Sequence, residues 1–218
     1  MIKNYLCLEK AVRVVNAFAT LVIAACVAFL TYQQYLVQKS LSEPFFNLKI
    51  EGRYDDGLKK FVDDFLVVRN DGAHARNIIV DSETFFLIND LDQKFKYKKF
   101  YIPASYYTAS FHTGNSQGII VKSFTFQNRL TLMNAINKII ESRIIMDISV
   151  VSFTTISYRT ITGEKRKIFF RNEIEIDEMP DFIYSMRHMR KLDIENLSYS
   201  SICEHVAEGS IIPISQSQ

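Results

Sequence analysis

A long stretch near the N-terminus, residues 14–38, contains no charged side chain, and this feature constrains the fold more than any other. Its first part, VVNAFATLVIAACVAFLTY over residues 14–32, is apolar apart from Asn16 near one end. A helix of this length rises about 1.5 Å per residue and spans about 28 Å, close to the thickness of a bilayer's hydrocarbon core. Helices in soluble cores rarely run this far without a charged face. We therefore predict a transmembrane helix over residues 14–32.

The flanks of this helix suggest how it is oriented. The N-terminal tail, residues 1–13, carries the basic residues Lys3, Lys10 and Arg13. A polar helical stalk is expected over residues 33–43, ending before Pro44, and Lys39 is its only basic residue. The positive-inside rule then places the N-terminus in the cytoplasm and the following domain outside, in a single-pass protein of the cell membrane.

Two processed forms are alternatives to an uncleaved anchor. A basic start followed by an apolar run also describes a signal peptide. Within the run, residues 23–26 (IAAC) are similar to the lipobox of bacterial lipoproteins, which would make Cys26 a lipidated first residue. Against this, the apolar run continues through residues 27–30, where a lipoprotein usually turns polar, and Glu9 is unfavourable in a signal peptide.

The remainder of the chain has the composition of a strand-rich globular domain. It is rich in Phe (17) and Tyr (11) and poor in Gly (7) and Pro (4), which favours strands over flexible or disordered segments. Cys203 is the one cysteine that lies well beyond the anchor, so the domain cannot close an internal disulfide. The net charge of +2 is too small to indicate nucleic-acid binding. We place this domain at residues 44–193 and a C-terminal tail at 194–218.

Apolar alternation and turn residues predict a succession of strands and two helices in this domain. Strands are expected at residues 45–51, 61–69, 78–90, 94–102, 105–112, 118–126, 144–158 and 168–176. Pro103 would separate two of them, and the apolar phase slips at Val150 and Val151 in a way that suggests a bulge. A helix with Asn128 as its N-cap is expected at residues 128–142, and a second helix begins at Pro180. The chain end from Ile214 is expected to be frayed.

One segment resembles a known type of domain. Residues 65–78, FLVVRNDGAHARNI, resemble the strand–turn–strand of immunoglobulin-like domains in bacterial surface and membrane proteins. In that pattern the turn Asn70–Gly72 supplies a positive-φ position, and small Ala75 lets the returning strand pack closely. Residues 156–170 resemble the later hairpin of such domains. The resemblance implies a mainly β fold: an antiparallel immunoglobulin-like β-sandwich with one or two inserted or terminal helices. It carries no activity, since sandwiches host many functions.

The sequence contains no recognisable catalytic or metal-binding motif. The four histidines, His74, His112, His188 and His205, lie in separate predicted elements without ligand spacing. The carboxylate pairs at residues 55–56 and 63–64 could offer oxygens to calcium, but solvated turns and strand edges have the same composition. We therefore predict no catalytic residue, no metal and no cofactor, and a chain that is not an enzyme.

Two further segments are candidate binding surfaces. In KFKYKKFY, residues 94–101, the basic side chains could meet anionic groups, or could protect an edge strand from aggregation. These basic residues are Lys94, Lys96, Lys98 and Lys99. In the helix that begins at Pro180, a face made of Phe182, Met186 and Met189 could lie in a partner's groove, or could close one end of the sandwich.

These observations predict a single-pass, membrane-anchored protein-interaction or assembly module without catalytic activity. Its partners would be the lipid bilayer and another protein, and nucleic acid is disfavoured. The alternative is an accessory subunit of a secretion or conjugation complex of the envelope, with a small α+β domain. A structure that opens with helices after Pro44 would favour that alternative. An enzyme whose catalytic residues come together only in the fold is the third interpretation, and a closed pocket with two histidines and a carboxylate would favour it.

Overall fold

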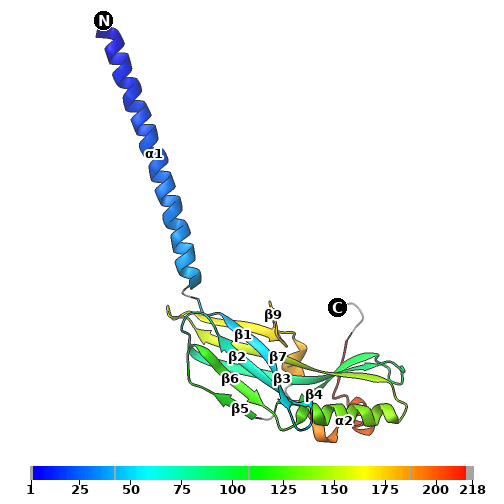
Figure 1. The fold of residues 1–218 in the computed structure, drawn as a ribbon. Helices are drawn as coiled ribbons and strands as arrows, with labels where there is room; N and C mark the ends of the chain where they lie inside the picture. The colour runs from blue at the N-terminus through cyan, green and yellow to red at the C-terminus, as the bar shows by residue number, and fades with distance from the viewer. Residues whose placement is uncertain (1, 42, 108, 187, 215–218) are drawn as a thin grey trace. The chain divides into compact units, whose positions relative to one another are not determined.

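The structure, a computed structural model, describes residues 2–41, 43–107, 109–186 and 188–214 (Figure 1). The chain divides into two compact units after Glu43. The first is one continuous helix, α1 (Ile2–Leu41), so the predicted tail, membrane span and stalk share a single helix. Its segment Val15–Gln38 has a mean hydropathy of 2.0 and is long and apolar enough to cross a membrane. None of this segment is buried against the rest of the protein, and a signal sequence would meet the same criteria.

The second unit is built mainly of strands, as predicted (Figure 1). One sheet has four strands in the order β1-β2-β6-β5, and the other has seven, six of them in the order β10-β4-β3-β7-β8-β9 with β11 also on β4. The first sheet contains β1 (Phe46–Asp55), β2 (Lys60–Asn70), β5 (Ala109–His112) and β6 (Gly118–Phe124). The second contains β3 (Arg76–Asp90), β4 (Lys99–Ser105), β7 (Met146–Arg159), β8 (Lys165–Arg171), β9 (Ile174–Ile176), β10 (Leu192–Asp193) and β11 (Ile212–Pro213). The β10–β4 pair is parallel, and the other pairs are antiparallel.

Three apolar clusters hold this unit together. One lies between the two sheets, where Leu48 and Val68 of the first sheet pack with Ile156 of the second. Another lies where α2 (Asn128–Glu141) and α4 (Tyr199–Ala207) cover the other end of the second sheet, and it includes Ile202 of α4. A third lies under the short helix α3 (Phe182–Met186). Burial of apolar surface in these clusters is the main force that stabilises the fold.

The turn predicted at Asn70–Gly72 is held in place by the buried side chain of Asn70. Its Oδ1 accepts the N–H groups of Phe45 (3.0 Å) and Gly72 (3.1 Å). Its Nδ2 donates to the carbonyls of Ala73 (2.7 Å) and Ser116 (2.6 Å). Asn70 is 1% exposed, and these four bonds join the start of β1, the β2–β3 turn and the β5–β6 turn. Gly72 is not among the glycines with positive φ, so that part of the prediction is wrong.

Several predicted strand boundaries differ from the structure. β1 does not stop at Gly52 but continues to Asp55. Residues 94–98 are not strand, because β4 begins at Lys99, and Pro103 lies inside β4 opposite Phe85. The strands predicted on the two sides of Pro103, at residues 94–102 and 105–112, correspond to β4 and β5, which belong to different sheets. Residues 168–176 are not one strand but the hairpin β8–β9, with Asn172 in the left-handed region (φ 54°) at its turn.

The expected bulge at Val150–Val151 is also wrong, because pairing between β7 and β3 is continuous from Ile79 to Asp90. The apolar phase changes because β7 is covered on both faces. Ile148 and Ile156 pack into the clusters on one face, whereas Val151 and Phe153 pack under α3 on the other. A strand buried on two sides loses simple alternation.

The helices differ from their predictions at their ends. α2 matches the expected helix, but Gln127 is its N-cap, and Asn128 instead donates a hydrogen bond from Nδ2 to the carbonyl of Tyr106. α3 spans five residues, shorter than the helix expected from Pro180.

The C-terminal part is not the tail expected from residue 194. It contains a 3₁₀ turn, Ile194–Asn196, followed by α4 and β11, and its apolar residues are buried in the domain core. Those core residues are Ile194, Leu197, Ile202 and Ile211. Ile214 donates its N–H to the carbonyl of Lys99, and the fraying expected beyond it concerns residues outside those described.

Candidate functional site

An exposed apolar surface lies at the turn between β1 and β2. We call it the hairpin-tip surface and define it by Tyr54, Leu58 and Phe61, which are 45–50% exposed. The turn is held by Asp55, whose Oδ1 accepts the N–H of Leu58 (2.9 Å), and by Lys59 in the left-handed region (φ 51°). A register shift at Tyr54 interrupts the pairing of the two strands. These features hold three large apolar side chains at the surface.

The ring of Phe61 is the best-fixed part of this surface. It meets the ring of Tyr54 edge-on, with ring centroids 5.3 Å apart, and the guanidinium of Arg129 lies 5.1 Å from its centroid. A Cβ at position 52 would lie 2.8 Å from its Cδ1, so Gly52 makes room for it. Aromatic and arginine side chains held in this way are enriched where proteins bind one another.

A polar cluster beneath the hairpin-tip surface links β1, β2, α2, the crossover after β4 and the residue that follows β6. Asp64 accepts hydrogen bonds from Tyr106 Oη (2.7 Å) and from Nη1 of Arg129 (3.1 Å). Buried Asp63 pairs with Arg53 (2.5 Å) and accepts a bond from Thr125 Oγ1 (3.1 Å).

The electrostatics of this cluster favour a structural role. Burial, followed by the hydrogen bond to Asp64 and the charge of that residue, raises the pKa of Tyr106 well above its usual value of 10.0. Burial, followed by the charges of Asp64 and Glu173, likewise raises the pKa of Tyr107. Both phenols therefore stay neutral in the folded protein. The carboxylates of Asp63 and Asp64 already form hydrogen bonds or ion pairs with neighbouring side chains. The cluster therefore serves to hold neighbouring elements together.

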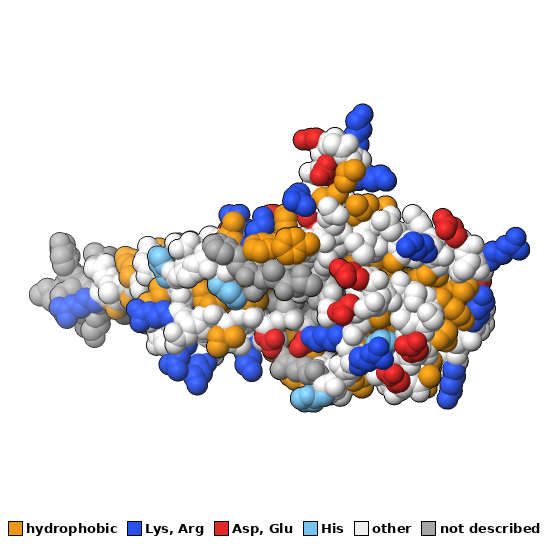
Figure 2. Space-filling model, turned by 90° about the horizontal axis from the view of Figure 1, so that it is seen from below, with side chains coloured by type: hydrophobic (Ala, Val, Ile, Leu, Met, Phe, Trp, Pro, Cys, Tyr) orange, Lys and Arg blue, Asp and Glu red, His pale blue; other side chains and the backbone are white. Residues whose placement is uncertain are grey.

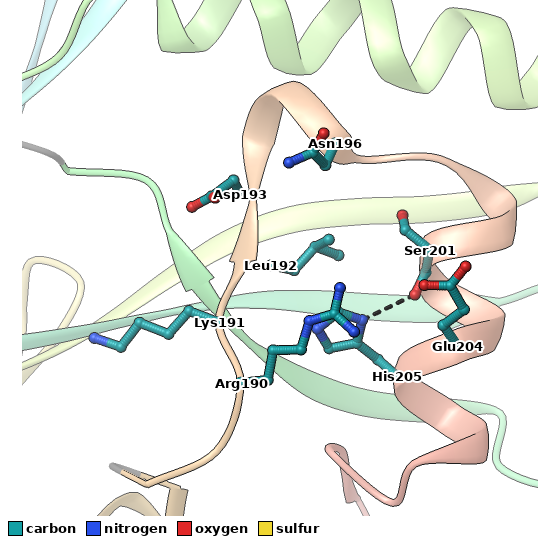
Figure 3. Close-up of a pocket in the computed structure, with 8 residues that line it drawn as sticks. All are labelled: Arg190, Lys191, Leu192, Asp193, Asn196, Ser201, Glu204 and His205. Carbon is teal, nitrogen blue, oxygen red and sulfur yellow. Dashed lines mark hydrogen bonds between the residues drawn. The ribbon is translucent and has the colours of Figure 1, made fainter.

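A polar pocket of about 420 Å³ lies between β10 and α4 (Figure 3). Charged and polar side chains from both elements surround Leu192. The lining residues are Arg190, Lys191, Leu192, Asp193, Asn196, Ser201, Glu204 and His205. The pocket exists because α4, which the sequence pattern missed, packs across the end of the second sheet. The signal for α4 is the apolar spacing of Tyr199, Ile202 and Val206 after Ser198, which is its N-cap.

His205 extends from α4 toward β10 in this pocket (Figure 3) and is 1% exposed. Its Nδ1 lies 2.9 Å from the carbonyl oxygen of Ser201, as the dashed line shows. A carbonyl can only accept, so Nδ1 is the donor and a neutral ring has its lone pair on Nε2. Among the described residues, Nε2 has no hydrogen-bond partner.

The basic segment at residues 94–99 is not an edge strand. Residues 94–98 form a loop, and β4 begins at Lys99. β4 has neighbours on both sides, β3 on one and β10 and β11 on the other. Lys94 pairs with Asp92 (3.4 Å) and its Nζ lies 5.9 Å from the centroid of the Tyr199 ring. Lys96 lies over the ring of Tyr97 at 5.4 Å. Lys98 and Lys99 are exposed, so the residues do not form one face of a sheet.

The predicted partner-binding helix face is turned inward. Met186, the last residue of α3, is buried in the cluster under this helix, and Phe182 and Met189 pack against the same cluster. The ring of Phe182 stacks on that of Tyr101, with centroids 5.3 Å apart. This face closes one side of the second sheet, so it is not open to a partner. Cys26 is exposed within α1, and its lipidation stays a prediction.

The other titratable candidates are dispersed. His74 is exposed, and its Nδ1 lies 2.5 Å from Ser116 Oγ. Asp55 and Asp56 lie at the hairpin turn, and the pair at 63–64 belongs to the polar cluster described above. Within the described residues, no group of three or more His, Cys, Asp or Glu side chains could hold a metal ion.

On the face shown in Figure 2, hydrophobic side chains lie exposed among charged side chains of both signs.

Comparison with known proteins gave no match to a family model, a curated protein or a solved structure.

Proposed function

We propose that the chain is a single-pass membrane protein whose strand-rich domain binds another protein at the same membrane and catalyses no reaction. The observation that carries this proposal is α1. Its apolar segment Val15–Gln38 has no part buried against the protein, so its side chains need another apolar environment, and a bilayer supplies it. The domain has its own core and begins at Pro44, a few residues beyond the helix. Such a chain holds a folded module at a membrane surface.

The strand order supports an immunoglobulin-like sandwich for this module. In that fold, strands A, B, E and D form one sheet, and C, F and G the other, with C′ added beside C in some members. Assigning β1 to β8 in chain order to A, B, C, C′, D, E, F and G gives β1-β2-β6-β5 and β4-β3-β7-β8, the orders seen here. The helix α2 would then be an insertion between E and F. Sandwiches of this kind often serve as binding modules, although the fold alone assigns no activity.

The element that follows Pro44 is β1 and not a helix, which favours this proposal over the secretion or conjugation subunit. A non-catalytic role is also supported by the polar cluster, whose carboxylates are used to join elements.

The hairpin-tip surface is our choice for the partner-binding region. Surface patches with apolar and aromatic side chains next to a fixed arginine mark many protein interfaces. The test is photo-crosslinking in intact cells, with a photoreactive amino acid at Leu58. Ile161 is the matched control, because both residues are 50% exposed and lie in turns between strands. A discrete adduct from position 58, absent from position 161, supports the proposal. Equal adducts from both positions, or none from position 58, contradict it.

Membrane topology is tested separately with Cys203, which is partly exposed in α4. Cys7 and Cys26 are replaced by serine, and intact cells are treated with a membrane-impermeant maleimide. We expect labelling before lysis, because we propose that the domain lies outside the cytoplasm. A lysed and denatured control shows that the thiol can react. Labelling only after lysis would place the domain in the cytoplasm, and release by alkaline carbonate would contradict the anchor.

A further inference from the structure

Basic side chains from three neighbouring strands meet on one exposed part of the second sheet. Arg76, Arg159 and Lys165 lie directly opposite one another on β3, β7 and β8. Residues directly opposite in antiparallel strands have their side chains on the same face, with Cβ atoms about 5 Å apart. Lys167 lies two residues beyond Lys165 on β8 and therefore shares this face. We call these four residues the basic face.

The basic face lies on the outer side of the second sheet. Tyr158 and Ile168 pack into the apolar cluster between the two sheets. Their neighbours Arg159 and Lys167 therefore point to the opposite side, because side chains alternate along a strand. All four residues of the basic face are exposed. An anion in the surrounding medium therefore has access to them.

The domain supplies no counter-charge to the basic face. Glu164, which is adjacent to Lys165 in the sequence, pairs with Arg166 instead (3.0 Å). Asp81, further along β3, lies opposite Thr155 and not opposite a basic residue. Within the part of the chain that the structure describes, the four residues of the basic face form no ion pair. Like charges directly opposite each other destabilise a sheet, so this arrangement points to an external anion.

The basic face lies at the end of the domain where β1 begins. The ring of Phe46, the first residue of β1, packs against the ring of Tyr158, with centroids 4.9 Å apart. Figure 1 shows the yellow turn between β7 and β8 at this same end. Pro44 follows Gln38, the end of the apolar segment of α1, by six residues, and six residues span at most about 22 Å. A bilayer that holds α1 therefore has its headgroups within reach of this end.

We propose that the basic face binds the anionic headgroups of phospholipids in the membrane that holds α1, an inference that rests on the proposed membrane anchoring. Lysine and arginine are attracted to an anionic membrane surface and donate charge-assisted hydrogen bonds to phosphate. Ile79 lies opposite Ser157 on the same outer side and is 64% exposed, so it adds an apolar contact beside the charges. The hairpin-tip surface lies at the other end of β1, so this contact directs it away from the lipid.

The test measures how close two positions of the domain lie to the lipid headgroups. The full chain, with Cys7, Cys26 and Cys203 replaced by serine, receives a single cysteine by Ile79→Cys or Ile140→Cys and a fluorophore on that cysteine. Ile140 is the matched control, because it is 50% exposed but belongs to α2, which packs on the opposite face of the second sheet. Nanodiscs contain a lipid with a nitroxide on its headgroup, which quenches only fluorophores that lie close to it.

The lipid composition separates attraction by charge from mere tethering. In nanodiscs that contain phosphatidylglycerol, we expect quenching at position 79 to exceed that at position 140 by about twofold or more. In nanodiscs of phosphatidylcholine alone, quenching at position 79 should be weaker. Added salt should weaken it in the anionic nanodiscs as well, because salt screens exposed charges.

Charge variants locate the contact. Arg159→Gln combined with Lys165→Gln should lower quenching at position 79 in anionic nanodiscs to the level seen in phosphatidylcholine. Lys98→Gln combined with Lys99→Gln is the control, since it removes the same charge from exposed residues outside the basic face and should change nothing. In detergent, the first pair should melt at the same temperature as the parent protein or higher, because it removes repulsion between neighbouring strands.

Three results would overturn the proposal: equal quenching at positions 79 and 140, quenching at position 79 that ignores phosphatidylglycerol or the first pair of substitutions, and a lower melting temperature of that pair. The first two would leave the basic face to another anion, such as an acidic protein or a nucleic acid, and the third would give its residues a structural role. A chain that does not enter nanodiscs would contradict the proposed anchoring itself. Failure with the chain inserted contradicts the lipid contact alone and leaves the proposed protein-binding function untouched.

Discussion

The side chain of Asn70 gives the sharpest test of how the domain is held together. Asn70→Ala removes four hydrogen bonds, two to the N–H groups of Phe45 and Gly72 and two to the carbonyls of Ala73 and Ser116. A hydrogen bond of this kind contributes about 1 kcal/mol net, which sets a total of about 4 kcal/mol. Some of these backbone groups regain water at the turns. We therefore expect the free energy of unfolding to fall by about 2–4 kcal/mol.

For a domain of this size, a loss of 1 kcal/mol lowers the melting temperature by about 2–4 °C, so Asn70→Ala should melt roughly 5–15 °C lower. The chain has no Trp, so thermal unfolding of the detergent-solubilised protein is followed by near-ultraviolet circular dichroism of Tyr and Phe. Asn137→Ala, at an exposed position of α2, is the control and should melt within about 2 °C of the parent protein. If Asn70→Ala melts with the control, the four bonds do not join the turns as argued.

Asn70→Asp separates the donor and acceptor roles of this side chain. The carboxylate keeps acceptors for Phe45 and Gly72, but it loses both donors and places a negative charge beside the carbonyls of Ala73 and Ser116. It should therefore be at least as destabilising as Asn70→Ala, despite its matching shape. A stability equal to that of the parent would refute the assigned orientation of the amide.

Three further predictions concern the core and the polar cluster. Tyr106→Phe removes the hydrogen bond to Asp64 and should cost about 1 kcal/mol. The pKa of Tyr106 is raised in the folded protein, so its contribution to the free energy of unfolding is intact below the unfolded pKa of 10.0. That contribution is lost as the pH rises above this value. The free energy of unfolding, measured from pH 8 to pH 11.5, should therefore fall less steeply in Tyr106→Phe than in the parent protein. Ile202→Ala, at a fully buried position of α4, should destabilise the domain by about 2–4 kcal/mol in urea unfolding, whereas a detachable tail would give no change. Asp63→Asn weakens the pairing with Arg53 and should cost about 1–3 kcal/mol, and the loss should be insensitive to added salt because Asp63 is buried.

The N-terminal apolar helix and most of the strands could be predicted because their signals are local. A run without charge identifies α1, and alternation identifies β3 from Ile78 to Ile88. The basic segment at residues 94–98 was wrongly predicted to be strand. Its apolar residues do not alternate regularly, since Phe95 occupies an odd position of the run and Phe100 an even one. In the structure, Gln93 in the left-handed region (φ 56°) precedes this segment, and Phe95 packs edge-on against Phe100 outside any strand.

The candidate sites were harder to predict because they depend on long-range packing. The hairpin turn was recognisable from Asp55 to Gly57, but nothing local indicates that Arg129 of α2 reaches Phe61. The pocket needs β10 to lie beside β4 and α4 to cross it, and the parallel pairing of Leu192 with Ala104 is not encoded in either segment alone. His205 could only be singled out once its neighbours were known.

The contact between Glu173 and β1 has a consequence for the membrane-bound arrangement that we propose. β1 is an edge strand, and Oε1 of Glu173, from the β8–β9 turn, accepts the N–H of Ile50 at 2.7 Å. Confinement to a membrane surface raises the rate at which the β1 strands of two copies meet. An edge strand with free backbone groups along its length could pair with β1 of another copy and extend the sheet. The carboxylate of Glu173 occupies the N–H of Ile50 in the middle of β1, so only two short stretches of the strand stay free for such pairing. Glu173→Ala should therefore convert a soluble detergent preparation into higher oligomers on size-exclusion chromatography, whereas Glu175→Ala should not. On this view Glu173 keeps neighbouring copies separate, so that the binding surface that we propose stays free.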